Sequence, residues 1–278
     1  MVNMKVSVVI ATLGDIGLKR TITKINKGSI IPSEILICIP KEYEVKEDLK
    51  SISNTRIIYT EEKGQVFQRS VGFRNIKNEL VLQLDDDVIL DFQTLENLIH
   101  ILKKLGKKTA VAPDFYWQGT KTLTYQRKNS GLFRYLMDWI ANGKEGWKPG
   151  IISLSGIPFG PIYYDEKIEY HQTEWLSGGC ILHYSDNLIK YNYFPFTGKA
   201  YAEDLIHSRL LRDNKVKLFV CHNARTWIDY EPYSSSIGDF YKQYKATKYS
   251  TLMYDRSITR LNLYFLIKFL LLQLKRFL

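Results

Sequence analysis

The sequence predicts an α/β fold in which a mostly parallel sheet is flanked by helices. Two observations support this class. Short apolar runs alternate along the chain with segments of helical periodicity. Hydrophobic residues at 45% and charged residues at 24% of the 278 positions match soluble globular proteins. Alternating strands and helices form parallel sheets, whose ligands gather beyond the carboxyl ends of the strands.

The first third of the chain carries the clearest alternation. Its expected strands are residues 6–11, 35–39, 56–59, 80–84 and 110–112. Residues 18–25 and 68–77 are expected helices. A further helix has an apolar stripe from Leu95 to Leu105, with Asp91 as its N-cap and Gly106 at its end.

From about residue 115 the chain changes to shorter, aromatic-rich segments. The expected elements there are strands at residues 122–125, 180–184 and 216–221, and a helix at 203–214. No linker or internal repeat separates the two parts. We therefore expect one domain over residues 1–255, with halves at about 1–113 and 114–255, followed by a separate helix at 256–278.

Charge and cysteine content narrow the setting. The net charge of +10 favours an anionic partner such as a nucleotide, a nucleic acid or an acidic membrane. Three widely spaced cysteines build neither a disulfide framework nor a zinc site, which favours a reducing compartment. The apolar run at the N-terminus is shorter than that of a signal peptide and is expected to be the first strand.

The last segment, residues 260–278, is rich in leucine and aromatic residues. Lys268 interrupts it, and Lys275 and Arg276 close it. Its apolar stretches are too short to span a bilayer. The pattern favours a basic amphipathic helix in the membrane interface. The alternative is a helix packed on the domain or on a second subunit.

Three successive carboxylates, Asp85, Asp86 and Asp87, end the expected strand at 80–84. Crowded carboxylates repel one another, and a hard divalent cation such as Mg²⁺ or Mn²⁺ prefers oxygen ligands of this kind. A solvated acidic loop, or a cap for the following helix, is the alternative. Upstream, Arg69 stands in "GQVFQRSVGFRN", where its guanidinium can pair with a phosphate or hold a carboxylate.

These motifs occur in an order that resembles the family 2 glycosyltransferases with the GT-A fold. "VSVVIATLGD" is similar to the opening strand and nucleotide loop of that family, and "ELVLQLDDDVIL" to its metal-binding aspartate motif. "YAEDLIHSRLLRDNKVKLFV" is similar to its acidic pair ahead of a helix. The resemblance implies a GT-A type, Rossmann-like sheet with a nucleotide-binding half, an acceptor-binding half and a C-terminal helix.

The resemblance also implies an activity and its residues. The activity is metal-dependent, inverting transfer of a sugar from a nucleotide-sugar donor to an acceptor hydroxyl, with Mn²⁺ or Mg²⁺ as cofactor. Asp204 would be the general base. The nucleotide would contact Ala11, Thr12, Leu13, Arg69, Asp85 and Asp86. The metal would be held by Asp85, Asp87 and His222, and the acceptor by Trp175, Gly178, Gly179 and Glu203.

The residues themselves support part of this assignment. An aspartate at a helix start is stabilised as an anion by the helix dipole, and a carboxylate can take a proton from a hydroxyl. The alternative is that Glu203 and Asp204 only cap their helix. The alternative for His222 is an ordinary surface or core histidine. The second strand ends in Cys38, Ile39 and Pro40 without the acidic residue usual in the family. The nucleobase therefore stays open.

Two other functions are compatible with parts of the pattern. A nucleotidyltransferase also uses aspartates and a metal, but only Gly14 and Gly17 stand after the first strand where a glycine-rich phosphate loop is expected. A basic module that binds RNA or membranes without catalysis has no need of three aspartates, which repel phosphate. The expected partners are a nucleotide sugar, a saccharide or lipid-linked saccharide and an anionic membrane surface, with no nucleic acid. The expected location is the cytoplasmic face of the cell membrane, in polysaccharide biosynthesis.

Overall fold

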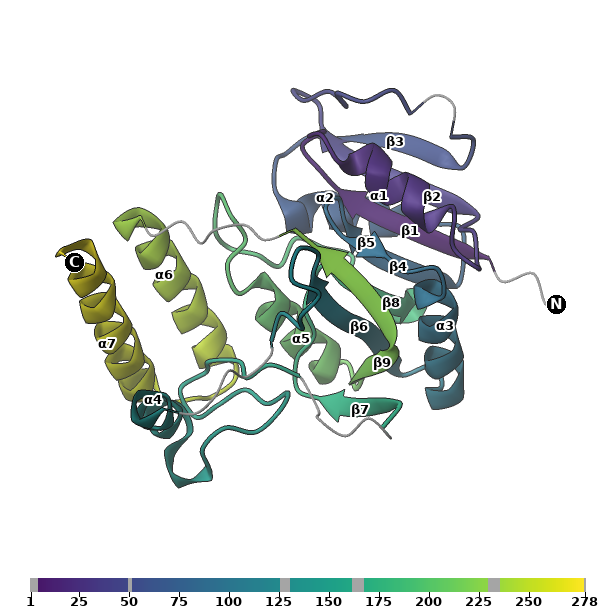
Figure 1. Cartoon of the computed structure of the whole chain (residues 1–278). Helices are drawn as coiled ribbons and strands as arrows, with labels where there is room; N and C mark the ends of the chain where they lie inside the picture. The colour runs from purple at the N-terminus through teal and green to yellow at the C-terminus, as the bar shows by residue number, and fades with distance from the viewer. Residues whose placement is uncertain (1–4, 50–51, 126–130, 162–167, 230–235, 278) are drawn as a thin grey trace.

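The computed structural model describes residues 5–49, 52–125, 131–161, 168–229 and 236–277. The strands are β1 (Val6–Ala11), β2 (Glu34–Pro40), β3 (Thr55–Thr60), β4 (Leu80–Asp85), β5 (Ile89–Leu90), β6 (Thr109–Trp117), β7 (Tyr170–Thr173), β8 (Cys180–Tyr184) and β9 (Lys217–Ile228). They form one sheet in the order β3-β2-β1-β4-β8-β6-β9-β5, with β7 beside β9 (Figure 1).

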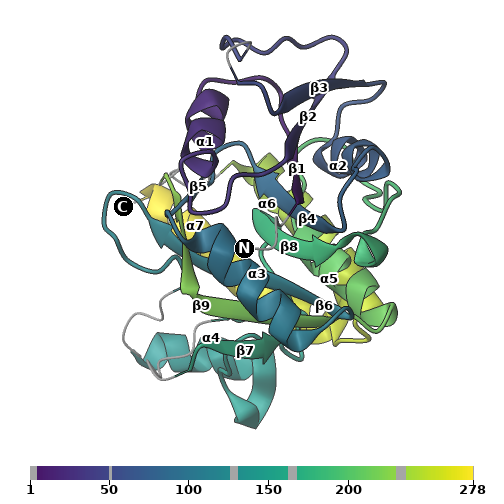
Figure 2. The same cartoon turned by 90° about the vertical axis from the view of Figure 1, so that its right-hand side faces the viewer.

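The helices cover both faces of this sheet. They are α1 (Leu18–Ile25), α2 (Gln65–Arg74), α3 (Thr94–Leu105), α4 (Leu132–Asn142), α5 (Glu203–Asp213), α6 (Ile237–Met253) and α7 (Ile258–Phe277), with short 3₁₀ helices η1 (Gly143–Glu145) and η2 (Ser185–Asn187). Figure 2 shows α1 and α3 on one side of the sheet and α2 and α5 on the other. The predicted α/β class is confirmed.

The amino-terminal half follows the sequence pattern closely. Strands β1 to β4 pair in parallel, and every residue of β1 is buried. Strands covered on both faces are continuously apolar, which is why their positions were predictable. The register sets Ala11 opposite both Cys38 and Asp85, so the carboxyl ends of β1, β2 and β4 meet at one edge.

Two helix boundaries differ from the prediction. Helix α2 begins at Gln65, after Gly64, whose φ of +154° favours glycine. Helix α3 has Gln93 at its N-cap, so the predicted cap at Asp91 is wrong. The Asp91 carboxylate accepts a hydrogen bond from the indole N–H of Trp227 at 2.6 Å instead.

The second half departs from a mostly parallel sheet. Strand β8 runs antiparallel to both β4 and β6, and β5 and β7 run antiparallel to β9. Only β6 and β9 pair in parallel there. A strand's side-chain period is the same in either direction, so the sequence predicted β8 without predicting its orientation. The expected strand at residues 122–125 contributes a single bridge, between Leu123 and Tyr116.

Helices α6 and α7 lie side by side at one end of the molecule, with α4 at the foot of α7 (Figure 1). Leu261 and Phe265 of α7 are 0% and 4% exposed, and the Phe265 ring packs edge-on against Phe240 of α6. The C-terminal segment is thus helical, as expected, and packs on the domain. No helix among the described residues is both long and apolar enough to cross a membrane.

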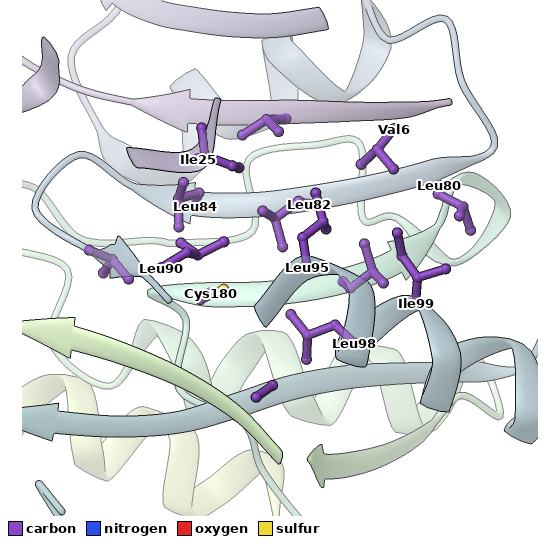
Figure 3. Packing of buried hydrophobic residues seen from close by; sticks show 14 of the residues in the cluster. Val6, Ile25, Leu80, Leu82, Leu84, Leu90, Leu95, Leu98, Ile99 and Cys180 are labelled. Atoms are coloured by element: carbon purple, nitrogen blue, oxygen red, sulfur yellow. The ribbon is translucent and has the colours of Figure 1, made fainter. Parts of the chain in front are cut away.

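The largest part of the core lies between the sheet and helices α1 and α3. Figure 3 shows Leu95 of α3 near Leu82 of β4, with Leu98 of α3 and Cys180 of β8 in the same buried cluster. This packing joins the two halves of the sheet, because β4 belongs to the first half and β8 to the second. It fixes the position of the aspartates that follow β4.

Gly72 provides a test of how closely α2 approaches the sheet. A Cβ at this position would lie 2.4 Å from Cγ1 of Val9 and 2.8 Å from Sγ of Cys38. We expect Gly72→Ala to destabilise the protein by about 1–3 kcal/mol through overpacking, against a helix-propensity gain of about 1 kcal/mol. Urea unfolding measures the change. Gly119→Ala, which meets no atom within 4 Å, is the control; an unchanged or higher midpoint for Gly72→Ala would contradict the close approach.

Candidate active site

The loop after β1 and the aspartates after β4 are joined by direct contacts. The Thr12 hydroxyl donates a hydrogen bond to the Asp86 carboxylate and accepts one from the N–H of Gly14 at 2.9 Å. The Thr21 hydroxyl donates to the Asp86 carbonyl at 2.7 Å. The structure therefore brings together the predicted nucleotide residues Thr12 and Asp86, from two neighbouring strand ends.

Two glutamines of α2, which the sequence analysis did not single out, stabilise this edge. The Gln68 side-chain amide donates to the carbonyls of Thr12 and Cys38, each at 2.7 Å. The Gln65 amide donates to Oδ1 of Asp85 at 3.0 Å. Their spacing of three places both on the face of α2 that looks toward the strand ends. That spacing is the signal by which they were identifiable.

Arg69 lies at the centre of the site, with its side chain 2% exposed. Its Nη2 lies 2.5 Å from Oδ1 of Asp85, and its Nη1 lies 3.0 Å from Oε1 of Glu203. Nη2 also donates to the Gly178 carbonyl at 3.3 Å. Of the two expected roles for this guanidinium, the structure supports holding carboxylates. Direct contact with a nucleotide is not supported, because both terminal nitrogens are engaged and covered.

The carboxylates after β4 are crowded, and Asp85 and Asp86 are partly buried. Burial raises the pKa of Asp85 above its ordinary value even though Arg69 opposes the shift. Burial, and then the charge of Asp85, raise the pKa of Asp86. Asp87 is exposed. A cation bound at this edge would relieve the repulsion.

The carboxylates after β4 are compatible with a divalent cation whose remaining coordination positions are filled by water or by a bound ligand. Within the described ranges, no group of three or more His, Cys, Asp or Glu side chains is arranged to hold a metal ion. Mg²⁺ is typically bound by one or two carboxylates together with water and substrate phosphates. Asp85 and Asp87 fit that pattern of oxygen ligands.

His222 has other partners. Its Nδ1 lies 2.8 Å from Oδ2 of Asp114, and its Nε2 lies 2.8 Å from Nδ1 of His171. Burial, and then the neighbouring His222, lower the pKa of His171 to about 4. Both ring nitrogens of His222 are engaged, so a metal-ligand role requires these hydrogen bonds to break. The role stays a prediction that this arrangement does not favour.

Asp204 is the second residue of α5. Its Oδ1 accepts a hydrogen bond from the N–H of Leu205 at 2.9 Å. Burial, and then the charge of Glu203, raise the pKa of Asp204 to about 7. The helix start was expected to favour the anion, but burial outweighs that effect. A carboxyl that titrates near neutral pH is suited to accept and release a proton.

Two of the expected acceptor residues, Glu203 and Trp175, make contacts within the protein. Oε1 of Glu203 accepts hydrogen bonds from Arg69 and from the Tyr193 hydroxyl, and the residue is buried. Trp175 is 2% exposed and donates its indole N–H to the Phe159 carbonyl at 2.9 Å, within a core cluster. Both side chains are covered by protein. Their contact with an acceptor stays a prediction that this burial does not favour.

Gly178 and Gly179 contact the site through their backbones. The Gly178 carbonyl accepts from Gln83 at 2.5 Å as well as from Arg69. A Cβ on Gly178 would lie 2.9 Å from Oε2 of Glu203, and one on Gly179 would lie 3.3 Å from Oδ2 of Asp85. The absence of side chains lets the carboxylates approach this segment. The predicted contact with an acceptor sugar stays a prediction.

A cavity of about 1040 Å³ opens at the carboxyl ends of β1 and β4. Its lining includes the predicted Ala11, Thr12, Leu13 and Asp86. It also includes residues that the sequence analysis missed: Lys63, Gln65, Gln68 and the segment 192–200 with Phe194, Phe196 and Lys199. The volume is at the upper end of the roughly 300–1,000 Å³ typical of small-molecule sites.

The structure is similar to two solved glycosyltransferase structures. GalNAc-T7 with UDP, GalNAc and Mn²⁺ superposes with a TM-score of 0.61 and 16% identity, over 91% of this chain and 48% of that one. This chain therefore spans about half the length of the GalNAc-T7 chain. Residues 1–349 of TarS from S. aureus superpose with a TM-score of 0.53 and 15% identity, over 94% of this chain and 69% of that one. The chain has the GT-A fold.

Comparisons of the sequence alone found no match. No protein-family model matches the chain. No curated protein matches it significantly.

The raised pKa of Asp204 predicts a pH-dependent stability. Below pH 4 the carboxyl is protonated in the folded and the unfolded chain, so it does not change the free energy of unfolding. Between about pH 4 and pH 7 only the unfolded chain releases the proton, so stability falls with rising pH by at most about 1.4 kcal/mol per unit. Above pH 7 the loss is constant.

Asp204→Asn should remove this loss. We expect the variant to gain stability over the native protein as pH rises from 4 to 7, measured by urea unfolding at a series of pH values. Asp213→Asn, at a half-exposed position on the same helix, is the control. A pH-independent difference between Asp204→Asn and the native chain would contradict the raised pKa.

Proposed function

We propose that this chain is a glycosyltransferase that moves a sugar from a nucleotide-sugar donor to an acceptor hydroxyl. One observation carries the proposal. In a GT-A fold, a nucleotide-sized cavity bounded by Asp86 lies beside the Arg69 network that holds Asp85 and Glu203, and Asp204 follows Glu203 directly. A donor site and a carboxylate of suitable pKa are thus joined by one buried ion-pair network.

In the proposed reaction Asp204 removes the proton from the acceptor hydroxyl. The hydroxyl oxygen forms a bond to the anomeric carbon as the bond from that carbon to the nucleotide diphosphate breaks. Attack from the face opposite the diphosphate inverts the anomeric configuration. The proton resides on Asp204 and the negative charge leaves on the diphosphate, so atoms and charge balance.

The residues of the cavity position the donor. Thr12 and Asp86 fix one another at the mouth of the donor cavity, with Ala11 and Leu13 beside them. Arg69 acts indirectly, by holding Asp85. A divalent cation bound by Asp85 and Asp87 would neutralise the departing diphosphate as a Lewis acid.

The neighbours suggest the class of donor and cofactor. GalNAc-T7 was crystallised with UDP, GalNAc and Mn²⁺, which supports a nucleotide sugar and Mn²⁺ or Mg²⁺ for this chain. We propose a saccharide acceptor, lipid-linked or part of a growing polysaccharide, used at the cytoplasmic face of a membrane. The support for the membrane is an apolar face of α7, where Leu263, Leu266, Leu270 and Leu274 are exposed.

The charge of α7 is less favourable to this membrane proposal than the sequence suggested. Burial lowers the pKa of Lys268, and its ammonium group lies 5.7 Å from the centre of the Phe265 ring. Arg260 donates to the Trp139 and Ile140 carbonyls. The side chains of Lys275 and Arg276 lie outside the described residues. Apolar contact, more than headgroup pairing, is thus the main support for membrane binding.

Two variants test the donor site and the base separately. Asp87→Ala should lose Mn²⁺-dependent affinity for UDP, because it removes an exposed oxygen ligand without disturbing the core. Asp204→Asn should keep that affinity and lower turnover by at least about 10²-fold, the lower end of what a general base contributes. Isothermal titration measures UDP binding with and without Mn²⁺, and product formation from a panel of nucleotide sugars measures turnover.

Each variant serves as the control for the other. Unchanged UDP affinity in Asp87→Ala would remove the metal role of that residue. Near-normal turnover in Asp204→Asn would reduce Asp204 to a helix-capping residue. A native chain that neither binds UDP nor hydrolyses any nucleotide sugar would argue against the proposed function as a whole.

The membrane proposal has its own test. Replacing Leu263, Leu266 and Leu270 by Gln leaves the packed residues Leu261 and Phe265 in place. We expect flotation with phosphatidylglycerol liposomes to weaken by at least about tenfold, since each buried leucine contributes about 1.5 kcal/mol or more. A control variant replaces Ile16, Ile31 and Phe92, which are more exposed than these leucines and lie outside α7, by Gln. Equal flotation of the two variants would contradict membrane binding through α7.

A further inference from the structure

A second cavity, of about 260 Å³, lies where α4 and the start of α7 meet the segment 157–160. This volume is just below the roughly 300–1,000 Å³ of typical small-molecule pockets, which suits one sugar ring better than a nucleotide. The side chains that give it chemical character are Tyr125, Arg134, Asp138, Trp147, Phe159 and Tyr264. None of them is in the motifs that carry the resemblance to glycosyltransferases.

Tyr125 connects this cavity to the proposed base. It lines the 260 Å³ cavity and also a much smaller one that it shares with Asp114 and Ser177. Burial, and then the charge of Asp204, raise the pKa of Tyr125 to about 12, and the phenol is hydrogen-bonded to Ser177. Tyr125 therefore lines the cavity and is also close enough to Asp204 for that charge to act on its pKa.

The walls combine flat aromatic faces with paired polar groups. The rings of Trp147 and Phe159 are stacked, with centroids 6.5 Å apart and an angle of 28°. On the α4 side of the lining, Nε of Arg134 lies 3.8 Å from Oδ1 of Asp138. The Tyr264 hydroxyl of α7 is close enough to both for their charges to act on its pKa, which burial raises. Aromatic faces with a few convergent donors and acceptors are typical of sites for small polar ligands.

The charge of the walls selects a neutral ligand. The Asp138 side chain is 8% exposed and offsets the positive charge of Arg134. A phosphate or carboxylate ligand would approach a buried carboxylate at close range, which is unfavourable. Hydroxyl groups can donate to Asp138 and accept from Arg134 at the same time.

We propose that this cavity is an acceptor subsite that binds a neutral pyranose unit, with the ring against Trp147 and its hydroxyls at Arg134 and Asp138. The proposal rests on the proposed function, because it supplies the acceptor that Asp204 deprotonates. It places part of the acceptor site on α4 and α7. These are the helices whose outer faces expose Leu136, Trp139 and Leu266.

The test uses the full-length chain with UDP and Mg²⁺ and a panel of methyl pyranosides of glucose, galactose, N-acetylglucosamine and N-acetylgalactosamine. Saturation-transfer NMR measures binding. We expect at least one glycoside to bind, and its affinity to fall about tenfold in Trp147→Ala, in keeping with the loss of an aromatic contact. Arg134→Gln, at a half-exposed position, should weaken it similarly. Trp139→Ala, on the outer face of α4, should not.

Donor chemistry is measured in the same variants as hydrolysis of the nucleotide sugar by water. We expect it to stay at the native rate in Trp147→Ala and Arg134→Gln. Three results would overturn the subsite: no glycoside binds while hydrolysis persists, both variants bind the glycoside like the native chain, or both lose UDP binding too. A native chain without UDP binding or hydrolysis would instead overturn the proposed function.

Discussion

The ion pairs of Arg69 with Asp85 and Glu203 are the interaction on which the site depends. Asp85 ends β4 in the first half of the chain, and Glu203 begins α5 in the second. A single buried guanidinium therefore joins the two halves at the site itself. Removing one partner of a buried ion pair typically costs about 3–5 kcal/mol, because it leaves charge without compensation. Removing Arg69 would leave the carboxylates of Asp85 and Glu203 both without compensation. The geometry of the site and the stability of the protein therefore depend on the same residue.

The placement of Asp204 follows from this network. Arg69 and the Tyr193 hydroxyl hold Glu203, and the left-handed Ala202, with φ of +55°, precedes it. Asp204 is then placed beside an already paired carboxylate, and it makes no ion pair of its own with a described residue. Burial and the neighbouring negative charge set its pKa near neutrality. The ion pair thus stabilises one acid and leaves the next able to exchange a proton.

The sequence predicted most of the strands and helices that depend on local burial. It predicted little of the arrangement that depends on contacts between distant parts of the chain. Strands β1, β2 and β4 are buried on both faces, so their apolar runs were sufficient to predict them. The direction of β8 and the docking of α4, α6 and α7 depend on where the chain returns, and no local period encodes that. In the site, Asp86 and Thr12 meet as the motifs implied. The burial of Trp175 does not favour its predicted acceptor role, and a sequence alone does not distinguish a buried tryptophan from one that faces a sugar.

The two cavities share one dependence on the carboxy-terminal helices. Phe196, in the wall of the proposed donor cavity, packs edge-on against Tyr249 of α6, and Tyr264 of α7 lines the smaller cavity. Helix α6 contacts both α5 and α7. Asp204 is at the start of α5, so α6 packs on the element that carries the proposed base, and α7 packs on α6. The amino-terminal half alone would therefore supply a nucleotide edge without an acceptor side, and transfer between two substrates requires both.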